Sequence, residues 1–469
     1  MHGHSGDVAT LDPWYLGQVN RPIHNQIYNP LVRYDANLKP QPELAESWEE
    51  APDGSSVTFH LRQGVKFHNG RELVADDVVF NMERVKDAKI GHQLAPLAAL
   101  IDSAKALDKY TAQVLYKSPQ PGKFDLYDCM YILNKETIGQ INTKPIGTGP
   151  FKFQEWVAGE SVKMQRNPDY FRQGKPLVDG FTAKAYNDAQ AMTTALLADT
   201  VHFIEPCPYS EYGRLKDDKN LTIEISEVEG AFWNIALGCD KKPFDNKQVR
   251  QAFQYIVNRK TISEKTFFGA TQPIFAPYYL KHTWVYDPKY DNYFAFDLQK
   301  AKQMIAAAGY PNGFETTVIT FGSIPESGSI AQVMQADAAQ IGIKMTIKTM
   351  EAAQAYPIWL NGGYDIMVGA QARVNKDPSS LFGIPIYKKD NSAKFRSAEY
   401  DRLVDEGMKT LDVEKRKQIY RQLQSIMVDE SWSIVVATKP NIWPRRTYLQ
   451  GYQANIDAFM MLENAWLDK

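Results

Sequence analysis

Short segments in the first half of the chain alternate apolar and polar residues with the period of a β-strand. The segment 57–62, VTFHLR, is the clearest case, and 151–153 and 162–164 repeat the pattern. Alternation of this kind predicts half-buried strands. The pairs Asp53-Gly54 and Asn69-Gly70 are typical of turns. The first half is therefore predicted to be rich in strands and turns.

Helical spacing dominates the second half. Apolar residues recur at intervals of three and four over 249–257 and 298–308, which predicts helices with one buried face. Asp245 and Asp297 precede these segments and are predicted N-caps, because Asp accepts hydrogen bonds from the free amides of a first turn. Gly309 is predicted to end the second helix.

A strand–helix–strand unit is predicted in the middle of this half, with strands at 316–320 and 343–347 and a helix at 330–341. A connection of this length joins parallel strands. The second half therefore reads as α/β. Further predicted elements are helices at 400–411 and 413–429 and a buried strand at 434–436.

Size and charge narrow the class of protein. The chain has 469 residues, 44% of them hydrophobic and 23% charged, which fits a globular protein of two or three domains. Its net charge is −2 and no run of Lys and Arg reaches five residues, so nucleic-acid binding is not expected. No apolar run approaches the ~18–20 residues of a membrane span.

Neither the N-terminal segment nor the cysteines predict a functional site. The segment MHGHSGDVATLDPW has no charged n-region and no apolar h-region, so no signal peptide is visible. His2 and His4 have metal-ligand spacing, but a frayed chain end is the favoured interpretation. The three cysteines are too few for a disulfide framework. Either Cys207 and Cys239 form a disulfide, or Cys129, Cys207 and Cys239 are all free thiols.

Catalytic motifs are absent from the sequence. It contains no HExxH, GxSxG, P-loop or GxGxxG pattern. We therefore expect neither an enzyme nor a bound cofactor or metal, and a binding protein becomes the leading hypothesis.

One segment resembles a known family closely. Residues 38–84, LKPQPELAESWEEAPDGSSVTFHLRQGVKFHNGRELVADDVVFNMER, resemble the signature region of the extracellular solute-binding proteins of family 5, the peptide/nickel/opine class. These proteins deliver ligands to ABC importers. Four further motifs are similar to those of the family and stand in its order: 145–151 (GTGPF segment), 167–171 (NPDYW-type turn), 242–252 (PFxDxxVRQA, with the Asp one place early) and 297–310 (helix ending AxxGY).

The resemblance implies an α/β fold of the periplasmic-binding-protein type II-like class, with two hinged lobes and an extra domain in the first lobe. The chain would cross between the lobes near 238–243 and near 438–444. The implied ranges are 1–38, 150–240 and 443–469 for lobe 1, 39–149 for the extra domain, and 241–442 for lobe 2.

The family places one ligand-binding loop after the strand at 364–368. Peptide-binding members carry a Trp there, then an Asp for the ligand's α-amino group, then a Pro four residues after the Asp. Counting back from Pro378 puts Val374 at the Asp position and Gln371 at the Trp position. The neighbouring Arg373 suits a carboxylate, a phosphate or a sugar hydroxyl edge. The alternatives are that Arg373 faces solvent or a structural carboxylate.

Other family positions also imply ligand contacts. Asp377 is a candidate amine anchor if the loop is shifted. Phe232 and Trp233 lie where the family often places aromatics beside the ligand, with a buried core role as the alternative. The remaining candidates are Tyr28, Asn29 and Trp359.

The resemblance implies a monomeric receptor, periplasmic or on the cell surface, with a small ligand and ABC permease subunits as partners. The missing anchor Asp favours an acidic or hydroxyl-rich ligand, such as an opine-like compound, a modified peptide or an oligosaccharide. The alternatives are an ordinary oligopeptide receptor, a metal-chelate receptor and a signalling receptor on the same scaffold.

Overall fold

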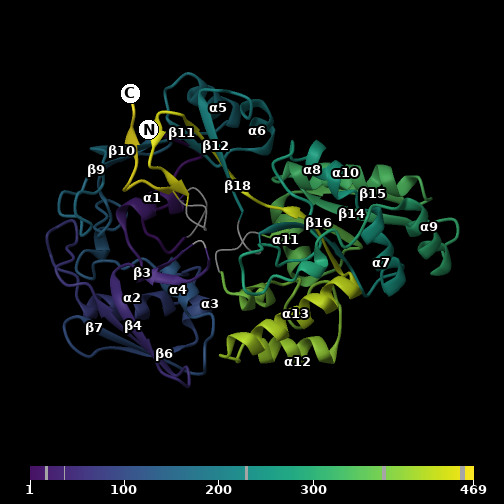
Figure 1. The fold of residues 1–469 in the computed structure, drawn as a ribbon, viewed down its shortest axis with the longest axis horizontal. Coiled ribbons are helices and arrows are strands. Elements are labelled where there is room, and N and C mark those ends of the chain that lie inside the picture. Colours follow the sequence, from purple (N-terminus) through teal and green to yellow (C-terminus); the bar gives the residue numbers. More distant parts are fainter. Residues whose placement is uncertain (16–19, 36, 228–230, 372–375, 455–459) are drawn as a thin grey trace. The chain divides into compact units, whose positions relative to one another are not determined.

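The computed structural model describes residues 1–469 except 16–19, 36, 228–230, 372–375 and 455–459. Contacts divide the chain into two compact units. Unit 1 comprises Met1–Ser226 and Asn441–Lys469, and unit 2 comprises Glu227–Pro440. Unit 2 is therefore inserted into the sequence of unit 1, and both chain ends belong to unit 1 (Figure 1).

The larger sheet of unit 1 has seven strands in the order β12-β18-β11-β1-β10-β9-β8. β1 pairs in parallel with both β10 and β11. His2 and His4 in this strand are buried, so the expected frayed end was wrong: the strand is held on both sides. The strands are β1 (His2–Ser5), β8 (Phe151–Val157), β9 (Ser161–Arg166), β10 (Gly180–Tyr186), β11 (Phe203–Glu205), β12 (Leu221–Ser226) and β18 (Asn441–Arg446).

The second sheet of unit 1 has the order β4-β5-β7-β6 and lies within the range predicted for the extra domain. The predicted alternation is confirmed in β5, whose Val57, Phe59 and Leu61 are buried. Helix α2 packs on this sheet. The elements are β4 (Ala45–Glu50), β5 (Ser56–Leu61), β6 (Ile101–Ala106), β7 (Thr111–Tyr116) and α2 (Ala75–Lys86).

Smaller elements complete unit 1. The helices are α1 (Asn20–Ile27), α3 (Ala95–Ala98), α4 (Phe124–Cys129), η1 (Ile138–Gln140), α5 (Ala189–Leu197) and α6 (Tyr209–Leu215). The short strands are β2 (Val32–Tyr34), β3 (Pro40–Pro42), β19 (Leu449–Gln450), β20 (Gln453–Ala454), β21 (Met460–Met461) and β22 (Trp466–Leu467).

Unit 2 is built on a five-stranded mixed sheet in the order β15-β14-β16-β13-β17. The predicted strand–helix–strand unit is confirmed, because α10 connects the parallel strands β14 and β15. The buried strand expected at 434–436 is part of β17. The strands are β13 (Phe232–Leu237), β14 (Glu315–Phe321), β15 (Lys344–Met350), β16 (Ile366–Gln371) and β17 (Ser433–Thr438).

Helices cover this sheet, and α12 and α13 lie side by side in unit 2 (Figure 1). The helices of unit 2 are α7 (Lys247–Ile256), α8 (Arg259–Lys265), η2 (Pro288–Tyr290), α9 (Leu298–Ala307), α10 (Pro325–Ala339), α11 (Ala352–Asn361), η3 (Pro378–Gly383), α12 (Ala398–Gly407) and α13 (Val413–Glu430).

One of the two predicted N-caps is confirmed. Asp297 caps α9 by accepting a hydrogen bond from the amide of Lys300. Asp245 does not cap α7; the cap is Asn246, whose side chain accepts from the amide of Gln248. Asp and Asn are about equally favoured as N-caps. The sequence alone therefore could not decide between Asp245 and its neighbour Asn246.

The first unit boundary falls before β13, not after it. The predicted lobe 1 ended at residue 240, whereas contacts place the boundary between Ser226 and Glu227. The reason is pairing: β13 lies between β16 and β17 of the unit 2 sheet. The second boundary, between Pro440 and Asn441, lies within the predicted crossing at 438–444.

The structure also bears on the expectations about disulfides and membrane-spanning helices. Cys129, Cys207 and Cys239 form no disulfide among the described residues. Across the described part of the chain, the helices are all too short or too polar to span a bilayer.

Candidate ligand-binding site

Asn29, a predicted ligand residue of unit 1, is buried just after α1 and engaged on both sides of its amide. Its Nδ2 donates to Oε1 of Glu43 at 2.6 Å, and its Oδ1 accepts from Oγ1 of Thr148 at 3.0 Å. The neighbouring Tyr28 is also buried, and its hydroxyl donates to the carbonyl of Leu11 at 3.0 Å. Both side chains are therefore fixed by their own unit.

The GTGPF-like segment passes directly under this position. A Cβ at Gly147 would lie 1.9 Å from the carbonyl oxygen of Ile27, and one at Gly149 would lie 2.4 Å from that of Gln26. No L side chain fits at such distances, so the two glycines allow the backbones to touch. The segment therefore packs directly against the end of α1 and fixes its position.

Charged residues surround Asn29 within unit 1. Glu43 forms ion pairs with Arg33, at 3.2 Å, and with Arg172. Arg172 also pairs with Glu463 at 2.7 Å. Burial alone would raise the pKa of Glu43, but Arg33 and Arg172 outweigh it and hold that pKa below its ordinary value. The network has two positive and two negative groups, so it presents no net charge.

A small cavity adjoins this network. It has room for about one water molecule. It therefore fits a bound water and not a whole solute. Its lining comprises Asn25, Gln26, Asn29, Arg33, Pro150, Tyr170, Met461, Leu462 and Glu463.

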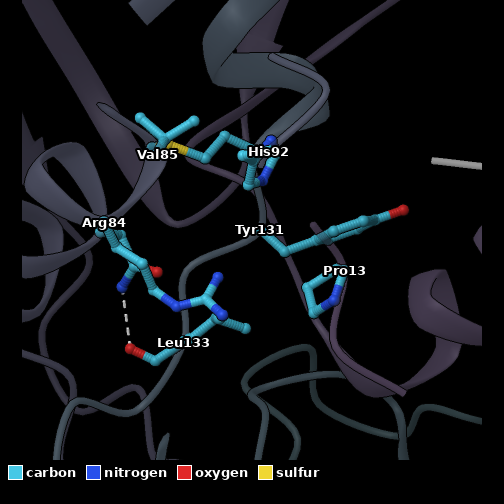
Figure 2. Close-up of a pocket in the computed structure, with 8 residues that line it drawn as sticks. Pro13, Arg84, Val85, His92, Tyr131 and Leu133 are labelled. Carbon is cyan, nitrogen blue, oxygen red and sulfur yellow. Dashed lines mark hydrogen bonds between the residues drawn. The ribbon is translucent and has the colours of Figure 1, made fainter. Parts of the chain in front are cut away.

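A second cavity of the same size lies beside α2 and is drawn in Figure 2. Asn81 donates to the carbonyl of Leu133 at 2.9 Å along one wall. Arg84 pairs with Asp12 at 2.5 Å and so ties the segment after β1 to α2. Figure 2 also labels His92 and Tyr131 among the lining residues. This cavity, too, is water-sized.

The candidates Phe232 and Trp233 lie next to each other on β13, between β16 and the edge strand β17 of the unit 2 sheet, and both are buried. Phe232 contacts the ring of Tyr387, with centroids 6.2 Å apart. Trp233 packs on Phe267 at 5.1 Å. Their contact with a ligand stays a prediction.

Gln371 ends β16 and faces the same part of the sheet. Phe232 and Gln371 are register partners in the β13–β16 pair. The side chain of Gln371 is buried, and its Nε2 donates to Oδ1 of Asn234 at 3.1 Å. The structure thus places Gln371 and Phe232 on one face of neighbouring strands, whereas Trp233, the next residue on β13, lies on the opposite face.

Asp377 has a structural partner. Its carboxylate lies 2.5 Å from Nη2 of Arg416, and the two side chains are 10% and 5% exposed. It also accepts from the amide of Ser379 at 2.9 Å and caps η3. An amine bound there would have to compete with a buried guanidinium. Arg373, with its neighbours 372–375, lies outside the described residues.

Trp359 lies on α11 and is partly buried. Its ring stacks on that of Tyr356, with centroids 5.3 Å apart, while Tyr356 itself is 54% exposed. Trp359 packs against the apolar core cluster of unit 2 to which Phe232 belongs. Its ligand role remains a prediction.

Two residues that matter in the structure escaped sequence reasoning. Asn234 lies in an otherwise apolar strand and accepts a hydrogen bond from Gln371. Glu43 forms the ion pairs with the two arginines near Asn29. The signal for Asn234 was present, because a polar residue interrupts the apolar run FWNIAL. Glu43 offered none, since a lone Glu in a connecting segment is usually exposed.

The comparisons with known proteins agree with this architecture. The family model of Bacterial extracellular solute-binding proteins, family 5 Middle, matches residues 39–393. The chain belongs to this family of soluble receptors that serve ABC importers. The type II-like, two-lobed α/β fold is that of its structural neighbours. Family members are binding proteins, which supports a non-enzymatic role.

Individual relatives differ in what they bind. Heme-binding protein A of Haemophilus influenzae is 30% identical, over 91% of this chain and 84% of the relative. Di/tripeptide-binding protein 1 of Pseudomonas aeruginosa is 30% identical, over 91% and 86%. The structure of the PBP AgaA in complex with agropinic acid from A. tumefacien R10 is similar, with a TM-score of 0.79, 26% identity and coverage of 100% and 98%. The family is therefore defined, and the ligand is not.

Proposed function

We propose that the protein encloses an acidic or hydroxyl-rich solute between its lobes by hinge closure and presents it to an ABC permease. Opine-like compounds, modified peptides and oligosaccharides fall in this class. The observation that carries the proposal is the Asp377–Arg416 pair, which is buried and 2.5 Å long. The carboxylate next to the predicted binding loop is already neutralised, and Val374 stands at the usual anchor position. An α-amino group would therefore lack its charge-assisted bond.

Two further observations support this class of ligand. Arg373 is adjacent to the anchor position in the sequence, and a guanidinium suits carboxylates and sugar hydroxyls. A similar protein has been solved with agropinic acid. The direct experiment is mass spectrometry of solute that co-purifies with the protein, and an acid or polyol is expected.

Arg373→Ala tests the residue assignment. We expect affinity for the co-purifying acid to fall at least about tenfold, which corresponds to about 1.4 kcal/mol. Isothermal titration calorimetry measures the change. Arg402→Ala is the matched control, because Arg402 is exposed on α12 and pairs only with Glu406 four residues on among the described residues. Equal affinities of native protein and Arg373→Ala would contradict the assignment of Arg373 as a ligand-binding residue.

An ordinary oligopeptide receptor is the second candidate. The 30% identity to a relative named as a di/tripeptide-binding protein favours it. A tight complex with a simple dipeptide would support this candidate and would place the amine anchor elsewhere than Val374.

A further inference from the structure

His68, in the loop that follows β5, forms three hydrogen bonds with the GTGPF-like segment. Its backbone amide donates to the carbonyl of Gly147 at 2.8 Å. Its ring Nδ1 accepts from the amide of Gly147 at 3.3 Å, and its ring Nε2 donates to the carbonyl of Gly149 at 3.0 Å. These three hydrogen bonds are called the His68 latch below. They join two parts of unit 1 that lie far apart in the sequence.

The two partners of the ring fix its protonation state. A backbone N–H can only donate a hydrogen bond, and a backbone carbonyl can only accept one. Nδ1 of His68 must therefore be unprotonated and Nε2 must carry the proton, which is one tautomer of the neutral imidazole. A proton added to Nδ1 would point at the N–H of Gly147, and that hydrogen bond would be lost. The latch therefore requires a neutral His68.

The segment that the latch holds is also bonded to the end of α1. The amide of Gly149 donates to the carbonyl of Ile27 at 2.9 Å. The hydroxyl of Thr148 donates to Oδ1 of Asn29 at 3.0 Å. If this segment moved away from His68, it would therefore break contacts of α1 and of Asn29, which is a predicted ligand residue.

The environment of the ring favours its neutral form. Burial is the largest cause that lowers the pKa of His68, to about 4; Lys152 on β8 lowers it further, and the bond to Gly149 opposes both. Lys152 pairs with Asp169 at 3.5 Å. The segment 145–149 has no ionisable side chain, and burial keeps the hydroxyl of Tyr28, next to it, neutral by raising its pKa.

The charged side chains of the loop that carries His68 do not compensate a charge on the ring. They are exposed to solvent or paired elsewhere: Lys66 is exposed, Glu72 pairs with Lys109, and Arg71 pairs with Asp77. A protonated His68 would thus lose one hydrogen bond and gain no new partner among the described residues.

We propose that the His68 latch is an acid-sensitive switch, in which a proton on His68 releases the segment 147–149 and, with it, the end of α1. The ring is partly exposed, so protons can reach it in the folded protein. The inference does not depend on which solute binds and goes beyond the proposed function. It makes the position of a predicted ligand residue depend on pH.

The direction of the effect follows from the two pKa values. A released histidine has its ordinary pKa of 6.5, whereas the latched ring has a pKa of about 4. Release therefore binds a proton, and it becomes more favourable as the pH falls from 6.5 toward 4. Between pH 7 and pH 5 the equilibrium constant for release should rise about twentyfold.

NMR of the histidine rings tests the protonation state in the full chain. Proton–nitrogen correlation spectra distinguish the two neutral tautomers of an imidazole. His68 should be the Nε2–H tautomer at neutral pH, and its ring should titrate with a midpoint of about 4. The Nδ1–H tautomer, or a midpoint at the ordinary value of 6.5, would overturn the inference.

Amide hydrogen exchange measures the release itself. The amide of Gly147 reports the bond to the ring, and the amide of Gly149 reports the bond to Ile27. After correction for the intrinsic effect of pH on exchange, the protection of both amides should fall about twentyfold between pH 7 and pH 5. Unchanged protection of Gly147 would overturn the switch. A fall at Gly147 without one at Gly149 would overturn the release of α1.

Two variants separate the latch from a general effect of acid. His68→Asn carries no titrating group at this position, so the protection of Gly147 should be the same at both pH values, whether or not Asn accepts the bond. His92→Asn is the matched control, because Nδ1 of His92 also accepts from a backbone amide, that of Leu94 at 3.1 Å, and its pKa is also lowered to about 4. This variant should keep the full loss of protection at Gly147. The same loss in His68→Asn as in the native protein would overturn the inference.

Discussion

Asp377 shows how one residue can change the interpretation of a binding loop. In the sequence it was a candidate anchor for an amine, because it lies close to the family's ligand position. In the structure its carboxylate is 2.5 Å from Arg416, and both groups are nearly inaccessible. Removing either partner would leave a buried charge uncompensated. Asp377 is therefore first a structural residue of unit 2.

Asp377→Ala should lower the free energy of unfolding by about 3 kcal/mol. Urea denaturation followed by circular dichroism measures the difference. Glu315→Ala is the matched control, because its partner Lys344 is 2.8 Å away but both side chains are more than 70% exposed. That exposed pair should contribute far less than the buried one, because solvent screens it. Equal effects of the two substitutions would contradict the structural role of Asp377.

At the scale of elements, period and capping chemistry predicted much of the fold. The alternation in β5 and the unit β14–α10–β15 follow from local patterns, because one face of each element is buried. The position of β13 did not follow. Its partners β16 and β17 come more than a hundred residues later, and no local pattern records such a pairing.

The N-terminus of α7 offers a test with its own control. Asn246→Ala should lower the free energy of unfolding by about 1 kcal/mol, because the amide of Gln248 loses its acceptor. Asp245→Ala, one residue earlier, should change it by less than about 0.5 kcal/mol. Thermal unfolding of the two variants measures both changes. A larger loss of stability in Asp245→Ala than in Asn246→Ala would show that Asp245 is the cap.

The candidate site shows where sequence reasoning ends. Gln371, Phe232 and Trp233 were predicted from the resemblance, and the structure places them on adjacent strands. Asn234 was missed because its importance depends on a hydrogen bond to a residue 137 positions away. The ligand contacts of Tyr28, Asn29 and Trp359 remain predictions.

At the scale of the whole molecule, buried histidines govern the response to acid. Burial is the largest cause in every case, and it keeps these groups neutral to a lower pH than in an unfolded chain, whose ordinary pKa is 6.5. The pKa falls to about 4 for His4, His24, His68, His92 and His202, and the pKa of His2 is also lowered well below its ordinary value.

Stability should therefore fall as the pH drops from 6.5 toward 4. In this window the unfolded chain binds protons that the folded protein does not, so the free energy of unfolding decreases with acidity. Each such group contributes up to about 1.4 kcal/mol per pH unit. Glu205, Glu227 and Asp337 oppose the trend, because burial raises their pKa, but they are three groups against six. Urea unfolding at pH 7 and pH 5 measures the loss; His24→Asn should reduce it, and equal stability at both pH values would contradict the prediction.

The place of β1 has a consequence for the order in which the protein can assemble. Its neighbours β10 and β11 begin at Gly180 and Phe203, and the next strand of the sheet, β18, begins only at Asn441. During synthesis β1 is made before either of its partners, the first of which begins some 180 residues later. The seven-stranded sheet closes only after the whole of unit 2 has been translated. Pairings so distant in sequence form slowly, so this sheet is expected to be completed late in folding.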